Sequence, residues 1–180
     1  GTIKQCANYA SIHTTSRSGS QTGGIAGHIW DGTVQDCFNT GFIEGNVIVG
    51  GILGLQSGES TVSSCYSIGN VKGYSEVGGI IGVVYHGDNP VTSKCYYVNS
   101  CLCKGITGED VENSAMPLAL SDFYSATLPD GFSSSVWQAG SAVADADYEQ
   151  LGTMFKRKVV GKCLHLKAVP TINENVYETY

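Results

Sequence analysis

The sequence predicts an all-β fold: a short parallel β-helix, or solenoid, of about three to four coils with a mixed C-terminal cap. Cysteines recur at positions 6, 37, 65 and 95, at intervals of 31, 28 and 30 residues, and such a period is typical of repeat architectures. Glycine makes up 24 of the 180 residues. The residues between the glycines are rich in β-branched and aromatic types, which favours short strands over helices.

The composition divides the chain near Lys104. Residues 1–108 contain 20 of the 24 glycines, whereas residues 104–180 contain 16 of the 26 charged residues. We therefore expect two regions. Residues 1–103 form the repeats, in units of about 1–31, 32–59, 60–90 and 91–103, and residues 104–180 form a capping and linking region with a short helix and strands.

Each unit contains the same sequence of short segments. A Thr-Val-like pair precedes the cysteine, an apolar position follows it by six residues, and a Gly-Gly-apolar-apolar-Gly block comes next in three units. The pairs are Thr2-Ile3, Thr33-Val34, Thr61-Val62 and Val91-Thr92; the later positions are Ile12, Ile43, Val71 and Cys101; the blocks are 23–27, 50–54 and 78–82. Each segment predicts one strand of a coil, so equivalent residues stack about 4.8 Å apart. The Gly-Gly pairs predict close approach of neighbouring coils or faces.

The first unit is longer than the others, and residues 14–22 predict a polar loop that bulges from the stack. The repeat cysteines form one ladder that faces the interior. Because cysteine behaves as a small buried hydrophobe, and stacked parallel side chains rarely reach disulfide geometry, we expect Cys37 and Cys65 to be buried and reduced.

The stretch 61–82 resembles the GLUG repeat, through the pattern Thr-Val-x-x-Cys-Tyr-Ser-Ile-Gly-Asn-Val-x-Gly followed by Val-Gly-Gly-Ile-Ile-Gly, and the stretch 33–54 resembles it as well. The resemblance covers about residues 1–103, although the first unit has Ala7 where an aromatic residue is usual and the fourth lacks the Gly-Gly block. GLUG repeats occur in bacterial surface proteins, including adhesin-like proteins and non-catalytic regions of immunoglobulin-A-cleaving metallopeptidases. The resemblance implies a right-handed stack, an extracellular or cell-surface location and repeats without catalytic residues.

A solenoid end exposes strand edges and an apolar cross-section, so we expect residues 104–180 to close it. Thr107-Gly-Glu-Asp is typical of a helix start. It predicts a short helix over about 109–120 that Pro117 interrupts. Strands that close the end are predicted at Trp137, Val159-Val160 and Leu164–Leu166, and residues 167–180 predict a linker or a further strand.

Two sets of charged residues share a register. Asp31, Glu59 and Asp88 occupy equivalent bends six, six and seven residues before a cysteine. Three roles are open to their carboxylates: they could be solvated by water, bind a Ca²⁺ ion, or act as the acid pair of a glycoside hydrolase. We favour solvated carboxylates, with no metal and no cofactor. His13, Glu44 and Lys72 each follow a cysteine by seven residues and predict a row of partners that pins the register.

Several cysteines could meet where the repeats join the tail: Cys95, Cys101, Cys103 and Cys163, with His165. Three alternatives remain open. These residues could hold Zn²⁺, a disulfide from Cys101 or Cys103 to Cys163 could staple the cap to the stack, or the thiols could be buried and unpaired.

A ligand is expected on a flat strand face or on the loop of residues 14–22. The candidate ligand-binding residues are Trp30, Tyr74 and Tyr85, because their aromatic rings can stack on sugars. The predicted function is a non-catalytic repeat module of a bacterial cell-surface or secreted protein, an adhesin or stalk that binds a host glycan or extracellular protein. The alternatives are a carbohydrate-active β-helix enzyme, or a spacer for a peptidase domain elsewhere in a larger parent chain.

Composition disfavours other classes. The net charge of −6 argues against nucleic acid, which is bound through clustered Lys and Arg. No apolar run approaches the ~20 residues of a membrane span, so we expect no membrane insertion. Residues 1–103 contain four basic residues, which disfavours a lyase acting on anionic polysaccharides, and the chain has no His-Glu-x-x-His peptidase motif.

Overall fold

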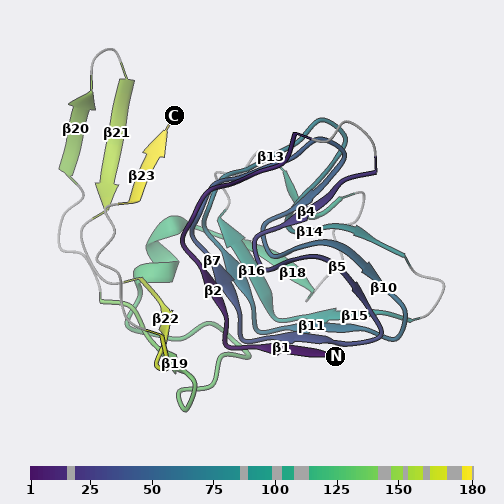
Figure 1. Cartoon of the computed structure of the whole chain (residues 1–180). Helices are drawn as coiled ribbons and strands as arrows, with labels where there is room; N and C mark the ends of the chain where they lie inside the picture. Colours follow the sequence, from purple (N-terminus) through teal and green to yellow (C-terminus); the bar gives the residue numbers. More distant parts are fainter. Residues whose placement is uncertain are drawn as a thin grey trace.

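The computed structural model describes residues 1–15, 19–85, 89–98, 103–107, 114–141, 147–151, 154–159, 163–169 and 176–179. The fold is nearly all β, and its parallel sheets form a solenoid of about three turns, which confirms the predicted fold class. In Figure 1, seen from the N-terminal end, the chain runs clockwise and recedes from the viewer, so the solenoid is right-handed.

The first two coils contain five strands each. These are β1 (Thr2–Lys4), β2 (Ala7–Asn8), β3 (Ile12–His13), β4 (Gln21–Gly23) and β5 (Ala26–Trp30), then β6 (Thr33–Gln35), β7 (Phe38–Asn39), β8 (Ile43–Glu44), β9 (Ile48–Gly50) and β10 (Leu53–Ser57). The third coil has β11 (Thr61–Ser63), β12 (Tyr66–Ser67), β13 (Val71–Lys72) and the long strand β14 (Glu76–Val84). A partial fourth coil follows, with β15 (Val91–Ser93), β16 (Cys95–Val98) and β17 (Lys104–Ile106).

Equivalent strands pair in parallel and in the predicted register. The sheet β1-β6-β11-β15 aligns the Thr-Val-like pairs, and β2-β7-β12-β16 aligns the residues that follow the cysteines. The sheet β3-β8-β13 aligns Ile12, Ile43 and Val71. In the fourth sheet, ordered β4-β9-β14-β10-β5, strand β14 pairs with both β9 and β10, so it spans in one strand what the first two coils divide into two.

The Gly-Gly pairs allow close packing, as predicted. A Cβ atom on Gly51 would lie 2.4 Å from Ser67 Oγ, on the sheet across the interior, and one on Gly79 would lie 2.5 Å from the Tyr97 ring. Both distances are far below van der Waals contact. Glycine is therefore required where the fourth sheet meets the second.

Each coil turns a corner immediately before its cysteine on a residue with a left-handed backbone. The four residues there have φ values of 52° to 54° and are Gln5, Asp36, Ser64 and Lys94. Non-glycine residues seldom adopt this conformation, and the four side chains share no chemical type. The sequence therefore gives no signal for this corner, which we call the cysteine corner.

Alternation along the second sheet creates two separate apolar clusters. Cys37, Cys65 and Cys95 point inward and are buried among aliphatic side chains such as Val34, Val62, Ile52 and Ile80. The next residue in each coil points outward, which gives a ladder of Phe38, Tyr66 and Tyr96 on the outer face. The prediction that Cys37 and Cys65 are buried and reduced is confirmed.

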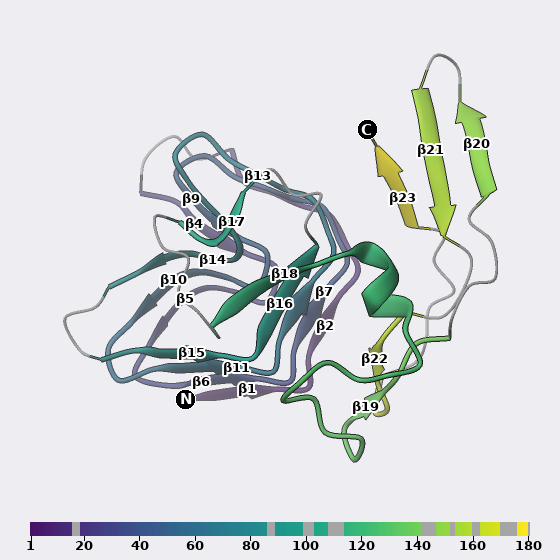
Figure 2. The same ribbon diagram turned by 180° about the vertical axis from the view of Figure 1, so that it is seen from behind.

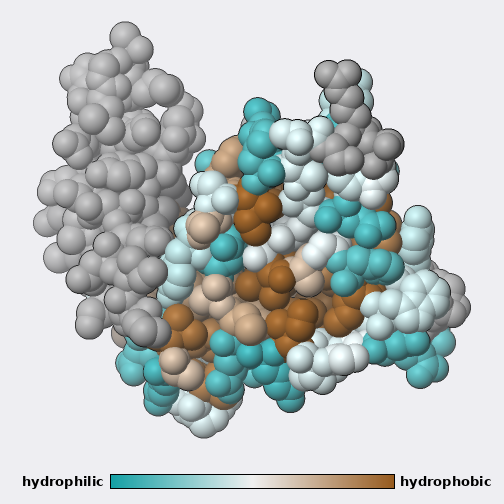
Figure 3. Space-filling view, viewed as in Figure 1, coloured by the Kyte–Doolittle hydropathy of each residue, from teal (hydrophilic) through white to brown (hydrophobic). Residues whose placement is uncertain are grey.

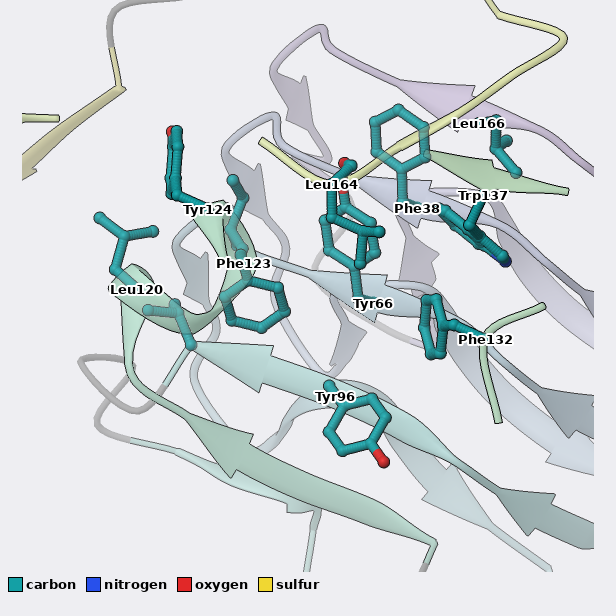
Figure 4. Packing of buried hydrophobic residues seen from close by; sticks show 12 residues of the cluster. Phe38, Tyr66, Tyr96, Leu120, Phe123, Tyr124, Phe132, Trp137, Leu164 and Leu166 are labelled. Carbon is teal, nitrogen blue, oxygen red and sulfur yellow. The ribbon is translucent and has the colours of Figure 1, made fainter. Parts of the chain in front are cut away.

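Residues 104–106 and 115–118 extend the last coil at the end of the stack, where the cap is predicted. The rest of the tail packed on this outer ladder covers it from the side, which the sequence does not predict. Figures 1 and 2 show the tail beside β2, β7 and β16. Its buried contributions to the outer cluster are Leu120, Phe123, Tyr124, Phe132, Trp137, Leu164 and Leu166. Figure 4 shows these side chains packed around Tyr66. Tyr66 stacks on Phe38 with ring centroids 5.0 Å apart, and its ring lies 5.7 Å from that of Trp137.

The secondary structure of the tail differs partly from the prediction. The helix predicted over about 109–120 is wrong for residues 115–118, which form strand β18 (Ala115–Leu118) beside β16, whereas residues 109–113 lie outside the described part of the chain. A 3-10 helix, η2 (Leu120–Tyr124), follows the strand. Pro117, which lacks an N–H, is tolerated because β18 is the last strand of its sheet. The predicted strands at Trp137 and at Leu164–Leu166 are confirmed, since β19 (Trp137–Gln138) pairs with β22 (His165–Leu166).

The tail also contains a separate antiparallel sheet of β20 (Asp147–Leu151), β21 (Met154–Val159) and β23 (Val176–Thr179). Val159 therefore lies in a strand, but in this sheet and not at the solenoid end. Val160 lies outside the described residues.

The polar loop predicted over residues 14–22 is shorter at its C-terminal side. Strand β4 starts at Gln21, and Thr22 is buried with its hydroxyl donating a hydrogen bond to Thr14 Oγ1 at 3.0 Å. Residues 16–18 lie outside the described part of the chain.

Candidate binding surface

Two of the three predicted aromatic residues lie on one ladder of the fourth sheet. Trp30 is in register with Ser57. Val84 is in register with Gln56, and the Tyr85 N–H donates to Gln56 O at 2.9 Å, so Tyr85 follows on the other side of Ser57. Side chains in register share a face, and two steps of the strand spacing separate the two aromatic positions by roughly 10 Å.

Both rings are open to solvent, while the residue between them is not. Trp30 is 64% exposed and Tyr85 is 58% exposed, whereas Ser57 is buried. Ser57 Oγ lies 2.7 Å from His28 Nε2, and the His28 ring meets the Trp30 ring edge-on at 6.4 Å. The small, buried Ser57 thus separates two exposed rings; we call Trp30, Ser57 and Tyr85 the open aromatic ladder.

A polar pocket adjoins Trp30 at the bend that leads to the first sheet. It is open and has a volume of about 780 Å³. Its polar lining residues include Asp31, Glu59 and Asn89, and residues 1–2 and 32–33 complete it. The bend residue of each coil has a left-handed backbone, at Asp31 (φ 50°), Gly58 (φ 69°) and Asn89 (φ 53°). Carboxylate and amide groups therefore lie beside an exposed indole ring.

The acidic edge is only partly available to a ligand. Asp31 Oδ1 accepts a hydrogen bond of 2.9 Å from the Glu59 N–H, so this carboxylate holds the bend of the next coil. Asp88 lies outside the described residues. Within the described ranges, no group of three His, Cys, Asp or Glu side chains could hold a metal ion. Asp31 and Glu59 are both exposed to solvent.

Tyr74 belongs to a different part of the surface. It follows β13, its N–H donates to Asn46 O at 2.8 Å, and its side chain is 90% exposed. The bend where it lies precedes β14, whereas Tyr85 follows β14. The predicted trio therefore does not form a single site.

The predicted polar row is confirmed on the third sheet. His13, Glu44 and Lys72 are in register. Glu44 lies 2.9 Å from His13 Nδ1 and 2.7 Å from Lys72 Nζ. The hydrogen bond from Lys72 holds the pKa of the Glu44 carboxyl below its usual value. All three groups reach solvent, so the row serves to pin the register of the coils.

The cysteines near the tail do not form one cluster. Cys95 is buried inside the solenoid, whereas Cys163 lies in the outer cluster, with its sulfur 3.7 Å from the Tyr66 hydroxyl. Cys103 is in a disulfide, while the Cys163 sulfur is a thiol. The zinc alternative is wrong, because the second sheet separates Cys95 from Cys163 and the Cys103 sulfur is in a disulfide. A staple from Cys101 or Cys103 to Cys163 is also wrong, because Cys163 is a free thiol. Cys101 lies outside the described residues.

Sequence reasoning missed the residues that hold the tail. At the cysteine corner, the Trp137 Nε1–H donates to Asp36 Oδ1 at 3.0 Å, Ser64 Oγ donates to Gly131 O at 2.9 Å, and Lys94 pairs with Asp130. The Tyr96 hydroxyl also donates to Asp130 O at 3.1 Å. Three successive coils thus offer polar groups in a row, and the aromatic residue after each cysteine was the only signal for this face.

Gln56 was also missed. It is fully buried beneath the open aromatic ladder. Its amide donates to Ser60 O at 3.2 Å and to Val91 O at 3.1 Å, and its Oε1 accepts from Thr92 Oγ1 at 2.7 Å. These bonds join three coils and make the strand that bears Ser57 rigid.

The described surface can therefore stack flat rings and hydrogen-bond polar groups beside them. Among the described groups, the shifted pKa values belong to the exposed ion pairs, to the thiols and phenols of the two cores, and to the exposed Cys6 thiol. Comparisons with protein-family models, curated proteins and solved structures found no match to this chain. In the described part of the chain, no helix is long and apolar enough to cross a membrane.

Proposed function

We propose that the chain is a non-catalytic repeat module of a bacterial cell-surface or secreted protein, acting as an adhesin or stalk segment that binds a glycan. The observation that carries this proposal is the open aromatic ladder. Two exposed rings flank a small buried serine on a rigid sheet, beside a pocket with carboxylate and amide groups.

The chemistry of this surface suits a sugar. The apolar faces of pyranose rings stack on indole and phenol rings, and sugar hydroxyls bond to carboxylates and amides such as those of Glu59 and Asn89. A spacing of roughly 10 Å between Trp30 and Tyr85 accommodates two successive rings of an extended glycan. The rigid sheet keeps both platforms in place before the ligand arrives, which lowers the entropic cost of binding.

Two features support an extracellular setting. Cys103 forms a disulfide, and disulfides persist mainly in oxidising compartments. The repeats also resemble GLUG units of bacterial surface proteins, which carry no catalytic residues.

The test is a glycan and matrix-protein array probed with the wild-type chain and three single variants, with calcium and with chelator. We expect reproducible glycan binding that Trp30→Ala and Tyr85→Ala each abolish or reduce at least about tenfold, because ring stacking is lost. Tyr74→Ala is the matched control, since Tyr74 is exposed but lies off the ladder, and it should bind as the wild type does.

A blank array would contradict the adhesin role and leave the module as a spacer. Binding that survives both ladder substitutions would place the site elsewhere. Loss of binding in chelator would indicate a cation at the acidic edge.

A further inference from the structure

A histidine lies on the same face as the open aromatic ladder. His28 precedes Trp30 by two residues on β5, so both side chains point outward from the fourth sheet. His28 is exposed, and its ring meets the Trp30 ring edge-on, with ring centroids 6.4 Å apart and an angle of 82° between the ring planes. The imidazole therefore stands beside the surface on which a sugar ring would stack.

Hydrogen bonds within the ladder determine which nitrogen of His28 carries the hydrogen. Ser57 Oγ lies 2.7 Å from His28 Nε2 and donates its one hydroxyl hydrogen to Ile29 O at 3.3 Å. Both contacts form together only when Nε2 carries the hydrogen and donates it to Ser57 Oγ. The neutral ring then has an acceptor at Nδ1, and no group in the described part of the chain donates a hydrogen bond to that atom.

The charged groups beside the ladder are acceptors as well. Trp30 is followed directly by Asp31, and Ser57 is followed two residues later by Glu59; both carboxylates are exposed. No lysine or arginine occurs among the residues that line the adjoining pocket. An acidic ligand would therefore meet like charge, which disfavours its binding.

The surroundings of the ladder are polar. Figure 3 shows apolar residues gathered over the interior of the coils, and mainly hydrophilic residues along the lower and right edges of the view, where the first and fourth sheets lie. Trp30 and Tyr85 are thus exposed rings in a hydrophilic setting. Such a surface suits a ligand that combines apolar ring faces with many hydroxyl groups.

We propose that the ligand of the open aromatic ladder is a glycan without acidic groups, and that His28 Nδ1 accepts a hydrogen bond from one of its hydroxyls. This inference rests on the proposed glycan-binding function. It names the class of glycan and adds a contact residue to Trp30 and Tyr85. Because the carboxylates and Nδ1 are all acceptors, sugar hydroxyls can donate to each of them, whereas a sugar carboxylate or sulfate can donate to none.

The class of glycan is tested on an array that includes two pairs of β-1,4-linked hexasaccharides. The members of a pair differ only at C6, which is a hydroxymethyl group in cellohexaose and mannohexaose and a carboxylate in their glucuronic and mannuronic acid counterparts. We expect every glycan whose binding is lost in Trp30→Ala to lack carboxylates and sulfates, and a neutral hexasaccharide to bind at least about tenfold more tightly than its acidic counterpart because of the like charges. High salt should narrow this difference.

An acidic glycan that binds through Trp30 as tightly as its neutral counterpart would overturn this inference and leave glycan binding itself intact. A blank array would contradict the proposed function and this inference together.

Two substitutions separate the roles of the two ring nitrogens. His28→Gln keeps a donor close to the position of Nε2 but has no acceptor at Nδ1, whereas His28→Asn keeps an acceptor close to Nδ1. At about pH 8, above the range in which histidines ordinarily protonate, we expect His28→Gln to lower the affinity for the bound glycan about two- to tenfold, as for a lost hydrogen bond. His28→Asn should lower it less. His13→Gln is the matched control, because His13 is exposed on the third sheet, and it should bind as the wild type does.

Both variants lose the edge-on contact with the Trp30 ring, so equal losses of affinity would show that His28 acts through Trp30 and would overturn its role as a contact residue. Unchanged binding in His28→Gln, together with loss in Trp30→Ala, would also overturn that role and leave the proposed function standing. Nitrogen NMR of the free labelled protein gives an independent readout, because the shifts of the two ring nitrogens identify the tautomer. A hydrogen on Nδ1 would contradict the proposal.

Discussion

The molecule has two aromatic ladders with opposite exposure. Phe38, Tyr66 and Tyr96 stack on the outer face of the second sheet, where the tail buries them. Trp30 and Tyr85 flank Ser57 on the fourth sheet, where both rings remain open to solvent. Both ladders arise in the same way, because a repeat places equivalent side chains on successive rungs.

The difference lies in what covers each ladder. The covered ladder has polar partners at the cysteine corner, where Asp36, Ser64 and Lys94 hold the tail. The open ladder has a polar pocket beside it instead. Aromatic rungs thus stabilise the fold on one face and remain exposed to solvent on the other.

The largest effect is expected from Trp137→Ala. Trp137 is 1% exposed and contacts the rings of Phe38, Tyr66 and Phe132. Removing a buried tryptophan costs about 3–5 kcal/mol, which urea denaturation monitored by circular dichroism would measure. Trp30→Ala is the control and should change the free energy of unfolding by less than about 0.5 kcal/mol, as is usual at exposed sites. Equal losses in the two variants would contradict the division.

The next effect is expected at the cysteine corner. Asp36→Ala removes the acceptor of the buried Trp137 indole N–H and should cost about 1–3 kcal/mol. It also loses a residue type that tolerates the left-handed backbone. Asp36→Asn keeps an acceptor oxygen and that tolerance, so it should retain most of the stability in the same denaturation experiment. If Asp36→Asn lowered the free energy of unfolding as much as Asp36→Ala does, the loss of the hydrogen bond would not explain the destabilisation.

A smaller effect is expected from Tyr66→Phe. The hydroxyl donates a hydrogen bond to Leu164 O, and its loss leaves a buried carbonyl without that partner. The expected cost is about 1 kcal/mol, seen as a lower urea midpoint with the slope unchanged. The ring stack is preserved in this variant, so a loss as large as that of Trp137→Ala would show that packing is not the main contribution.

The smallest effect is expected from Glu44→Gln in the exposed polar row. Lys72 lowers the folded-state pKa of Glu44, so the carboxylate stabilises the fold above its unfolded pKa of about 4.3. This contribution is lost as the pH falls through the lower folded-state value. Thermal midpoints of the wild type and the variant should therefore differ slightly at pH 7 and converge at pH 3. A difference that grows at low pH would contradict this ion pairing.

The register of the coils could be predicted from the sequence because it is repeated there. One period is shared by the glycine pairs, the cysteines and the Thr-Val-like pairs. Residues one period apart lie side by side on neighbouring coils, as Glu44 does with His13 and Lys72. The open ladder also arises from this repetition of the coils. The grouping of Tyr74 with Trp30 and Tyr85 is wrong, because an aromatic residue expected to be exposed can lie at any bend of the coil.

The position of the tail could not be predicted in this way. It depends on long-range contacts between residues that occur once, such as Trp137 with Asp36. The cysteine corner requires a backbone conformation that Gln5, Asp36, Ser64 and Lys94 adopt without sharing a residue type. The cysteines near the tail suggested one cluster, but Cys95 and Cys163 face opposite sides of one sheet.

The two tryptophans of the chain allow the most direct test of the division, because Trp30 belongs to the open ladder and Trp137 packs on the covered one. Acrylamide quenching of fluorescence should be strong for Trp30 and weak for Trp137, measured in Trp137→Phe and Trp30→Phe respectively. That result would confirm that the tail covers the outer face of the second sheet and leaves the fourth sheet open. Equal quenching of the two tryptophans, or stronger quenching of Trp137, would contradict the account.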